Sequence, residues 1–131
     1  MSQHAPVILI AEDNAPILNL NRRILQSFGY TVVTAMNGLD AWYILQGQAV
    51  NLAIVDIDMP TMNGFELVEH IRNSDDHEHR QLPILVLTTD ITSDSRKICE
   101  ELGVDLYAVK PMGTDELRAT VEKLLNSAHA H

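Results

Sequence analysis

The chain has 131 residues and a formal net charge of −9, with 46% apolar and 21% charged residues. This composition is typical of a soluble globular protein, and the length fits about one domain. The charge disfavours direct binding to nucleic acid or a membrane surface, because both would repel the chain. We expect neither a signal peptide nor a membrane span, and one cysteine, Cys99, cannot form an internal disulfide. These features predict a cytoplasmic protein.

Five short apolar runs predict the strands of a parallel sheet. The runs at Val7–Ala11, Leu52–Val55 and 84–87 are continuous rather than alternating, which is typical of strands covered on both faces. The weaker runs at Thr31–Ala35 and Leu106–Val109 predict strands nearer to the sheet edges.

Helical patterns separate these runs, with apolar side chains at the spacing of a buried helix face. Pro16 suits the first turn of the first helix, Gly29 its end, and Asn37 the start of the second helix. The fourth helix, predicted over residues 92–102, has few apolar residues to bury and is expected to be the least firmly held. The residues expected to face the core are Ile17, Leu20, Ile24, Phe28, Ala41, Leu45, Phe65, Val68, Ile71, Ile98, Cys99, Leu102, Leu117, Val121 and Leu124.

Strand and helix alternate along the chain, with a polar stretch at residues 73–81 that is expected to be a solvated loop containing His77 and His79. The alternation predicts a three-layer, doubly wound α/β domain with right-handed crossovers. We expect one domain over residues 1–131, with its core at residues 6–126 and a disordered tail at residues 127–131.

Polar side chains stand where the predicted strands end. Glu12 and Asp13 follow the first strand, Asp56 follows the third, Thr88 ends the fourth, and Lys110 follows the fifth. In open α/β sheets, binding sites form outside the carboxyl ends of the strands. If the first and third strands are neighbours, the three carboxylates crowd together, and a cation relieves their repulsion. Oxygen ligands beside a phosphate favour Mg²⁺, with Mn²⁺ as a second candidate.

This arrangement suits phosphoryl transfer. An ionised Asp56 can attack phosphorus as a nucleophile. Lys110 and the metal would neutralise charge on the transferring group, and Thr88 can donate a hydroxyl hydrogen bond to a phosphoryl oxygen. The sequence therefore predicts that Asp56 accepts a phosphoryl group.

The pattern resembles the receiver domain of response regulators in two-component signalling. The resemblance implies a flavodoxin-like fold with strand order 2-1-3-4-5, and a phosphoryl group taken from a histidine kinase or a histidine phosphotransfer protein. It implies a signalling domain rather than an enzyme, catalysing only its own phosphorylation and dephosphorylation. The residues that carry it are Glu12-Asp13, Asp56 with Met59-Pro60 and Gly64, Thr88, and Lys110-Pro111, whose peptide bond is usually cis in this family.

The resemblance also assigns metal ligands. Asp13, Asp56 and the backbone carbonyl of Asp58 would bind Mg²⁺, and Glu12 would hold a metal-bound water.

A switch is implied as well. Thr88 would move toward the phosphate, and Tyr107 would turn inward into the vacated space. The surface of the fourth helix, the fifth strand and the last helix would then engage a downstream protein or domain. The protein would act as a monomer or as a phosphorylation-dependent dimer.

Three residues stand beside the route by which water would reach the phosphoryl group: Asp58, Thr89 and Asp90. Our hypothesis is that they tune the lifetime of the phosphate, by orienting water or by repelling the phosphate.

Two other functions remain open from the sequence. A phosphatase of the haloacid-dehalogenase type would use Asp56 and Asp58, but its motif belongs on the first strand rather than the third. A pseudo-receiver would keep the fold and bind proteins without phosphorylation. The chain could be a free-standing regulator or a receiver excised from a longer protein.

Overall fold

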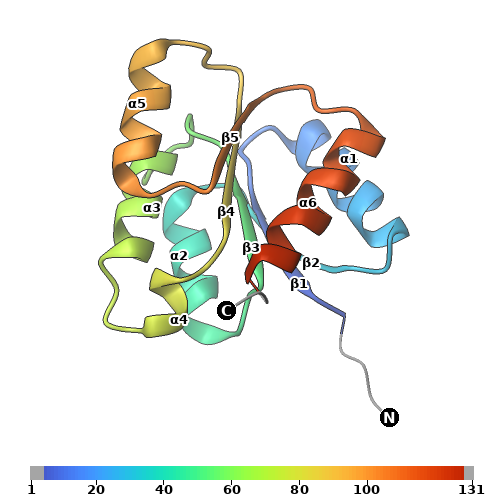
Figure 1. Ribbon diagram of the computed structural model, residues 1–131, viewed down its shortest axis with the longest axis horizontal. Coiled ribbons are helices and arrows are strands. Elements are labelled where there is room, and N and C mark those ends of the chain that lie inside the picture. Colours follow the sequence, from blue (N-terminus) through green and yellow to red (C-terminus); the bar gives the residue numbers. More distant parts are fainter. Residues whose placement is uncertain (1–4, 129–131) are drawn as a thin grey trace.

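The computed structural model describes residues 5–128 (Figure 1). Its five strands form one parallel sheet in the order β2-β1-β3-β4-β5, so the predicted fold class and strand order are confirmed. The two weaker apolar runs are the edge strands, as predicted. The strands are β1 (Val7–Ala11), β2 (Thr31–Ala35), β3 (Leu52–Val55), β4 (Ile84–Thr88) and β5 (Leu106–Val109).

Helices cover both faces of the sheet, with α2, α3 and α5 on one side and α1 and α6 on the other (Figure 1). Within the described range, no helix is both long enough and apolar enough to cross a membrane. Residues 127 and 128 belong to α6 and not to a tail, whereas residues 129–131 lie outside the described residues. The helices are α1 (Ala15–Ser27), α2 (Gly38–Gly47), α3 (Gly64–Arg72), α4 (His77–Arg80), α5 (Ser93–Leu102) and α6 (Thr114–Ala128).

The core consists of two layers, one on each face of the sheet. Successive side chains of a strand point to opposite faces. Leu9 therefore packs in the layer under α2 and α3, while Ile8 and Ile10 pack in the layer under α1 and α6. All residues of β3 and β4 are buried, which explains why their apolar runs are continuous.

Asparagine side chains start the first three helices. Asn14 accepts a hydrogen bond from the backbone N–H of Ile17, and Asn37 caps α2 as predicted. Asn63 and Glu66 form a capping box at the start of α3. Because Asn14 caps α1, the carboxylate of Asp13 beside it is not needed as the cap.

Two residues predicted to face the core are exposed instead. Leu20 is 59% exposed and Ile98 is 40% exposed. On α1 the buried side chains are Leu18 and Leu25, so its buried stripe is displaced from the predicted one. On α5 the buried stripe runs through Ser95 and Cys99, which leaves Ile98 at its outer edge.

The polar stretch at residues 73–81 is not simply a solvated loop. It contains the short helix α4, capped by Asp76, whose carboxylate accepts from the backbone N–H of Glu78. His79 is half-buried, and its ring nitrogens lie 2.9 Å from the hydroxyl of Ser74 and 2.9 Å from the carbonyl oxygen of Leu45. This stretch therefore packs against the end of α2.

Candidate functional site

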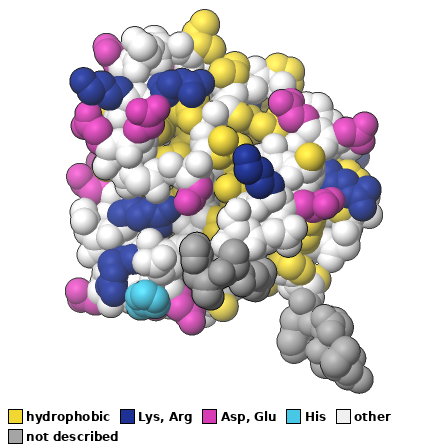
Figure 2. Space-filling model, in the orientation of Figure 1, with side chains coloured by type: hydrophobic (Ala, Val, Ile, Leu, Met, Phe, Trp, Pro, Cys, Tyr) yellow, Lys and Arg dark blue, Asp and Glu magenta, His cyan; other side chains and the backbone are white. Residues whose placement is uncertain are grey.

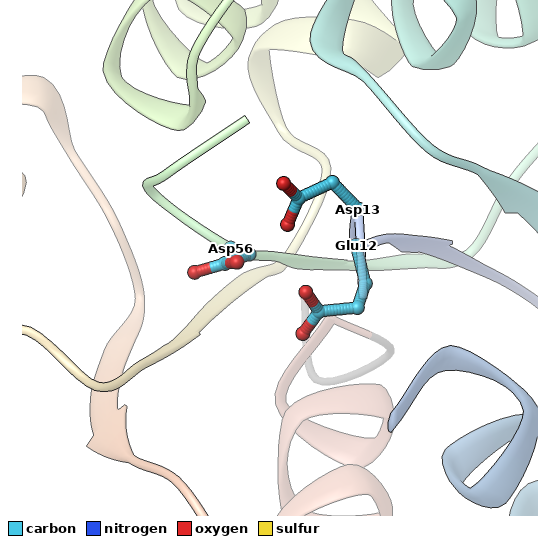
Figure 3. A group of neighbouring side chains, drawn as sticks. All are labelled: Glu12, Asp13 and Asp56. Atoms are coloured by element: carbon cyan, nitrogen blue, oxygen red, sulfur yellow. The ribbon is translucent and has the colours of Figure 1, made fainter. Parts of the chain in front are cut away.

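Three carboxylates meet at the carboxyl ends of β1 and β3: Glu12, Asp13 and Asp56 (Figure 3). The two strands are paired in parallel, with Ala11 beside Val55, so the residues that follow them share one edge of the sheet. One carboxylate oxygen of each residue lies within 4.8 Å of the other two. Glu12 and Asp56 are buried, whereas Asp13 is exposed. The sequence prediction that these three residues meet is therefore supported by the geometry.

Lys110 reaches the same cluster from the end of β5. Its Nζ lies 2.5 Å from Oε1 of Glu12 and 3.2 Å from Oδ2 of Asp56. Its backbone N–H donates to the carbonyl oxygen of Thr88 at 2.8 Å, which ties the end of β5 to the end of β4. The Lys110–Pro111 peptide bond is cis, as the resemblance implied. The ammonium group is thus held between two carboxylates.

The protonation of these groups reflects a buried site with an excess of negative charge. Burial raises the pKa of Glu12, and the charge of Asp56 raises it further, although the hydrogen bond from Lys110 acts in the opposite direction. Burial by itself would lower the pKa of Lys110, but its contacts with Glu12 and Asp56 raise it. Three carboxylates face one ammonium group, so a divalent cation would balance the remaining charge.

The donor set fits Mg²⁺ or Mn²⁺. Glu12, Asp13 and Asp56 offer only carboxylate oxygens, which hard divalent cations prefer. Among the described residues, no other group of three acidic, histidine or cysteine side chains is close enough to hold a metal ion. Asp58 is exposed, and a metal contact of its backbone carbonyl stays a prediction.

Thr88 is fully buried at the end of β4, next to β3 in the sheet. Its Oγ1 accepts a hydrogen bond from the backbone N–H of Asp90 at 3.1 Å. The carboxylate of Asp90 accepts from the hydroxyl of Ser95 at 2.5 Å and from the backbone N–H of Thr92 at 2.9 Å. These bonds, that from Ser95 first, lower the pKa of Asp90. Asp90 thus organises the β4–α5 loop, while Thr89 is exposed.

Tyr107 is half-buried on β5 and touches the same loop. Its hydroxyl donates a hydrogen bond to the backbone carbonyl of Asp90. The guanidinium carbon of Arg96 lies 4.9 Å from the centre of the Tyr107 ring, within the range of a cation–π contact. Sequence reasoning missed Arg96 and Ser95. The signal for Ser95 was its position four residues before Cys99, on the same helix face.

The loop after Asp56 is tightly packed. The backbone N–H of Gly64 donates to the carbonyl oxygen of Ile57 at 2.8 Å, and a Cβ atom at Gly64 would lie 2.3 Å from the carbonyl oxygen of Asp56. The N–H of Gly38 donates to the carbonyl oxygen of Met62 at 2.9 Å. The starts of α2 and α3 therefore fix the loop that carries Asp56.

The sheet is parallel and doubly wound, and its carboxylates and lysine cluster at the carboxyl ends of the strands. The chain is therefore one of the small α/β domains that bind ligands at that edge of the sheet. Within this class the match is specific: the family model described as the response regulator receiver domain matches residues 8–122. The chain belongs to this family. Receiver domains are signalling domains of two-component systems and not typical enzymes.

Curated relatives include sensor kinases and transcriptional regulators. The CAI-1 autoinducer sensor kinase/phosphatase CqsS of Vibrio cholerae is 33% identical over 116 residues, which are 88% of this chain and 17% of that protein. The probable transcriptional regulator ycf27 of Cyanophora paradoxa is 35% identical over 118 residues, 90% of this chain and 47% of that protein. The chain thus spans less than half the length of these relatives.

Solved structures share the fold over almost the whole chain. The chemotaxis protein CheY4 of Vibrio cholerae has a TM-score of 0.85 and 29% identity, covering 92% of this chain and 98% of that one. The receiver domain of the sensor histidine kinase PA1611 from Pseudomonas aeruginosa has a TM-score of 0.85 and 25% identity, covering 93% and 98%. That domain is described with a magnesium ion coordinated in its active-site cleft.

Proposed function

We propose that Asp56 is the phosphoacceptor of this receiver domain and takes its phosphoryl group from a histidine kinase or a histidine phosphotransfer protein. The position of Asp56 carries the proposal. Its carboxylate is buried, lies 3.2 Å from Nζ of Lys110, and shares the carboxyl edge of the sheet with Glu12 and Asp13.

In the proposed reaction, a carboxylate oxygen of Asp56 forms a bond to phosphorus while the bond from phosphorus to the donor's nitrogen breaks. Lys110 stabilises the negative charge of the transferring group. Oγ1 of Thr88 already accepts from the N–H of Asp90, so its own hydrogen remains available for a phosphoryl oxygen. Mg²⁺, held by Asp13 and Asp56 with Glu12 beside it, would supply further charge neutralisation.

We propose that phosphorylation shifts the surface formed by α5, β5 and α6. The contacts from Thr88 to Asp90 and from Asp90 to Tyr107 connect the site with this surface. Hydrogen bonds to charged groups contribute about 1.5–3 kcal/mol each, so two new bonds supply roughly 3–6 kcal/mol. Shifting a two-state equilibrium from 1:99 to 99:1 needs about 5.5 kcal/mol. Two contacts therefore reach the required free energy only at the upper end of this range.

The same surface is apolar enough for a partner. Hydrophobic side chains gather over β5 between α5 and α6 (Figure 2). Ile91 is 75% exposed, Val109 42% and Ile98 40%. We propose that a downstream protein, a downstream domain or a second phosphorylated copy covers these side chains.

A cytoplasmic location accords with the free, buried Cys99, since a reducing compartment keeps thiols free.

Intact-mass spectrometry tests the site directly. The protein is incubated with acetyl phosphate, with and without Mg²⁺. A gain of one phosphoryl group is expected in the wild type and in the control Asp58→Asn, only when Mg²⁺ is present, and no gain is expected in Asp56→Asn. Mg²⁺-dependent phosphorylation of Asp56→Asn would refute Asp56 as the acceptor. A wild type that gains nothing would favour the pseudo-receiver.

A further inference from the structure

The outer side of helix α2 exposes two large side chains, Leu39 and Tyr43, beside Asp40 and Gln46, and no other element of residues 5–128 covers them. The only polar side chains of α2 are those of Asp40, Trp42, Tyr43 and Gln46, and two of these are aromatic. Leu39 is 48% exposed and Tyr43 is 78% exposed. A surface helix normally presents charged and polar side chains to water. The outer side of α2 has the composition of a contact surface.

A groove lies beside this side of α2. It has a volume of about 600 Å³ and is lined by Trp42 and Gln46 of α2, by α3, and by the segment from residue 73 to residue 79. Residues three and four positions apart are neighbours on a helix, so Leu39 adjoins Trp42 and Tyr43 adjoins Gln46. The exposed side of α2 and the groove therefore form one continuous surface, called the α2 surface below.

The groove wall around Trp42 is held in place. The Trp42 ring lies 5.7 Å from the ring of His70 and 5.4 Å from the ring of His79, measured between centroids. His79 is fixed in turn by its contacts with Ser74 and with the backbone of Leu45. A wall that is already ordered loses less conformational freedom when a ligand binds.

The acidic side chains that line the groove favour a cationic ligand. Its lining includes three carboxylates, those of Glu69, Asp75 and Asp76, and it includes no lysine or arginine among the described residues. Lysine or arginine side chains of a partner could pair with these carboxylates, and one could lie against Trp42. A second copy that docks through its own α2 is disfavoured, because α2 carries no lysine or arginine to pair with these carboxylates.

We propose that the α2 surface binds a basic amphipathic helical segment of a partner protein. The apolar side of that segment would cover Leu39 and Tyr43, and its cationic side chains would face the groove. The groove is far from the phosphoacceptor along the strands, since α4 immediately precedes the amino end of β4 whereas Asp56 follows the carboxyl end of β3 (Figure 1). The groove therefore shares no lining residue with the α5–β5–α6 surface or with the acidic site, whereas Leu39, at the start of α2, lies nearer to the loop that carries Asp56.

The only tryptophan of the chain, Trp42, reports on this groove. The probe is a short synthetic peptide of leucine and lysine that forms an amphipathic helix and has no aromatic residue. A saturable change in Trp42 emission is expected, weakening as salt is added. A peptide with glutamate in place of lysine is expected to give no change. Equal binding of the two peptides would overturn the proposal.

Two exposed apolar residues provide a matched pair of variants. Tyr43→Ser is expected to weaken binding of the lysine peptide about tenfold, since aromatic anchors dominate such contacts. Ile91→Ser is the matched control. Ile91 lies on the β4–α5 loop and is 75% exposed, compared with 78% for Tyr43, and its substitution is expected to leave binding of the lysine peptide unchanged. Circular dichroism checks that both variants are folded.

Charge is tested with Glu69→Gln combined with Asp75→Asn, which is expected to weaken binding and its salt dependence. Equal weakening by Tyr43→Ser and Ile91→Ser would overturn the proposal, as would sedimentation showing that the free protein dimerises through Tyr43. The assay uses no phosphodonor, so its result is independent of the proposed function of Asp56.

Discussion

Gly64 shows how closely the backbone is packed around Asp56. A Cβ atom at Gly64 would lie 2.3 Å from the carbonyl oxygen of Asp56 and 2.8 Å from Cα of Ile57. Any side chain at this position therefore displaces the loop that carries the proposed phosphoacceptor, although Gly64 itself contributes no functional group.

We predict that Gly64→Ala lowers the free energy of unfolding by about 1–3 kcal/mol, the usual cost of overpacking. Slower phosphorylation by acetyl phosphate is expected too, because Asp56 shifts with its loop. Urea denaturation and intact-mass spectrometry measure the two effects. The control is Gly47→Ala, where a Cβ atom would meet nothing within 4 Å and the free energy of unfolding should not fall. Equal results for both variants would contradict the prediction.

Asp58 and Asp90 are expected to differ in their effect on the lifetime of the phosphate. Asp58 is exposed, whereas the Asp90 carboxylate is already bonded to Ser95 and Thr92. We predict that Asp58→Asn changes the dephosphorylation half-life more than Asp90→Ala does, because the exposed Asp58 side chain can reorient toward water whereas the Asp90 carboxylate is held by Ser95 and Thr92. The half-lives are measured by the decay of the phosphorylated mass. Equal half-lives in the wild type, Asp58→Asn and Asp90→Ala would reject the hypothesis that these residues tune the lifetime of the phosphate.

At the scale of elements, Arg72 connects the end of α3 to two other segments. Its guanidinium donates to the carbonyl oxygens of Gly103, His79 and Arg80, and lies 3.0 Å from the carboxylate of Asp105. Burial lowers the pKa of Arg72, and the charge of Asp105 acts against this. Arg72 thus holds together α4 and the turn between α5 and β5.

Arg72→Ala is predicted to lower the free energy of unfolding by about 2–3 kcal/mol, since several charge-assisted hydrogen bonds are lost together. Arg118→Ala is the control. Its ion pair with Glu122 is 56% and 51% exposed, and exposed pairs contribute about 1 kcal/mol or less. Chemical denaturation measures the free energy of unfolding of both variants. A decrease in Arg72→Ala no larger than that in Arg118→Ala would contradict the proposal that Arg72 holds these segments together.

Sequence patterns predicted the positions of the helices and strands better than they predicted which side of each helix is buried. The apolar runs predicted the strands because β3 and β4 are covered on both faces, which leaves a continuous signal. They misplaced Leu20 and Ile98, because the side of a helix that is buried depends on its rotation against the sheet. The four-residue helix α4 is too short to give a periodic pattern.

The acidic cluster, Thr88 and Lys110 were predictable because each residue ends or follows a strand, and the carboxyl ends of parallel strands lie at one edge of the sheet. Arg96 and Ser95 belong to α5, and their contacts with Tyr107 and Asp90 depend on how α5 packs beside β5. The sequence indicated only that Ser95 shares a helix face with Cys99, and not which residues these side chains contact. The groove beside Trp42 was missed for the same reason, since it depends on how α2 and α3 approach α4.

At the scale of the whole molecule, binding of Mg²⁺ should stabilise the fold by mass action. At a free Mg²⁺ concentration of about 100 times Kd, the gain is about 2.7 kcal/mol. We predict a rise in Tm with added MgCl₂ in the wild type and a much smaller rise in Asp13→Asn, which removes one carboxylate of the cluster. A series with NaCl at the same ionic strength separates binding from screening. An unchanged Mg²⁺ response in Asp13→Asn would exclude this carboxylate as a ligand.

The contact of Lys110 with Glu12 and Asp56 gives the acidic cluster a counter-ion that is part of the chain. Lys110 lies 98 residues after Glu12 in the chain, so this counter-ion reaches the cluster only when β5 has joined the sheet, and it balances one of the three negative charges. Two of the three carboxylates are therefore paired within the folded chain itself, in contrast to metal sites whose ligands have no other partner.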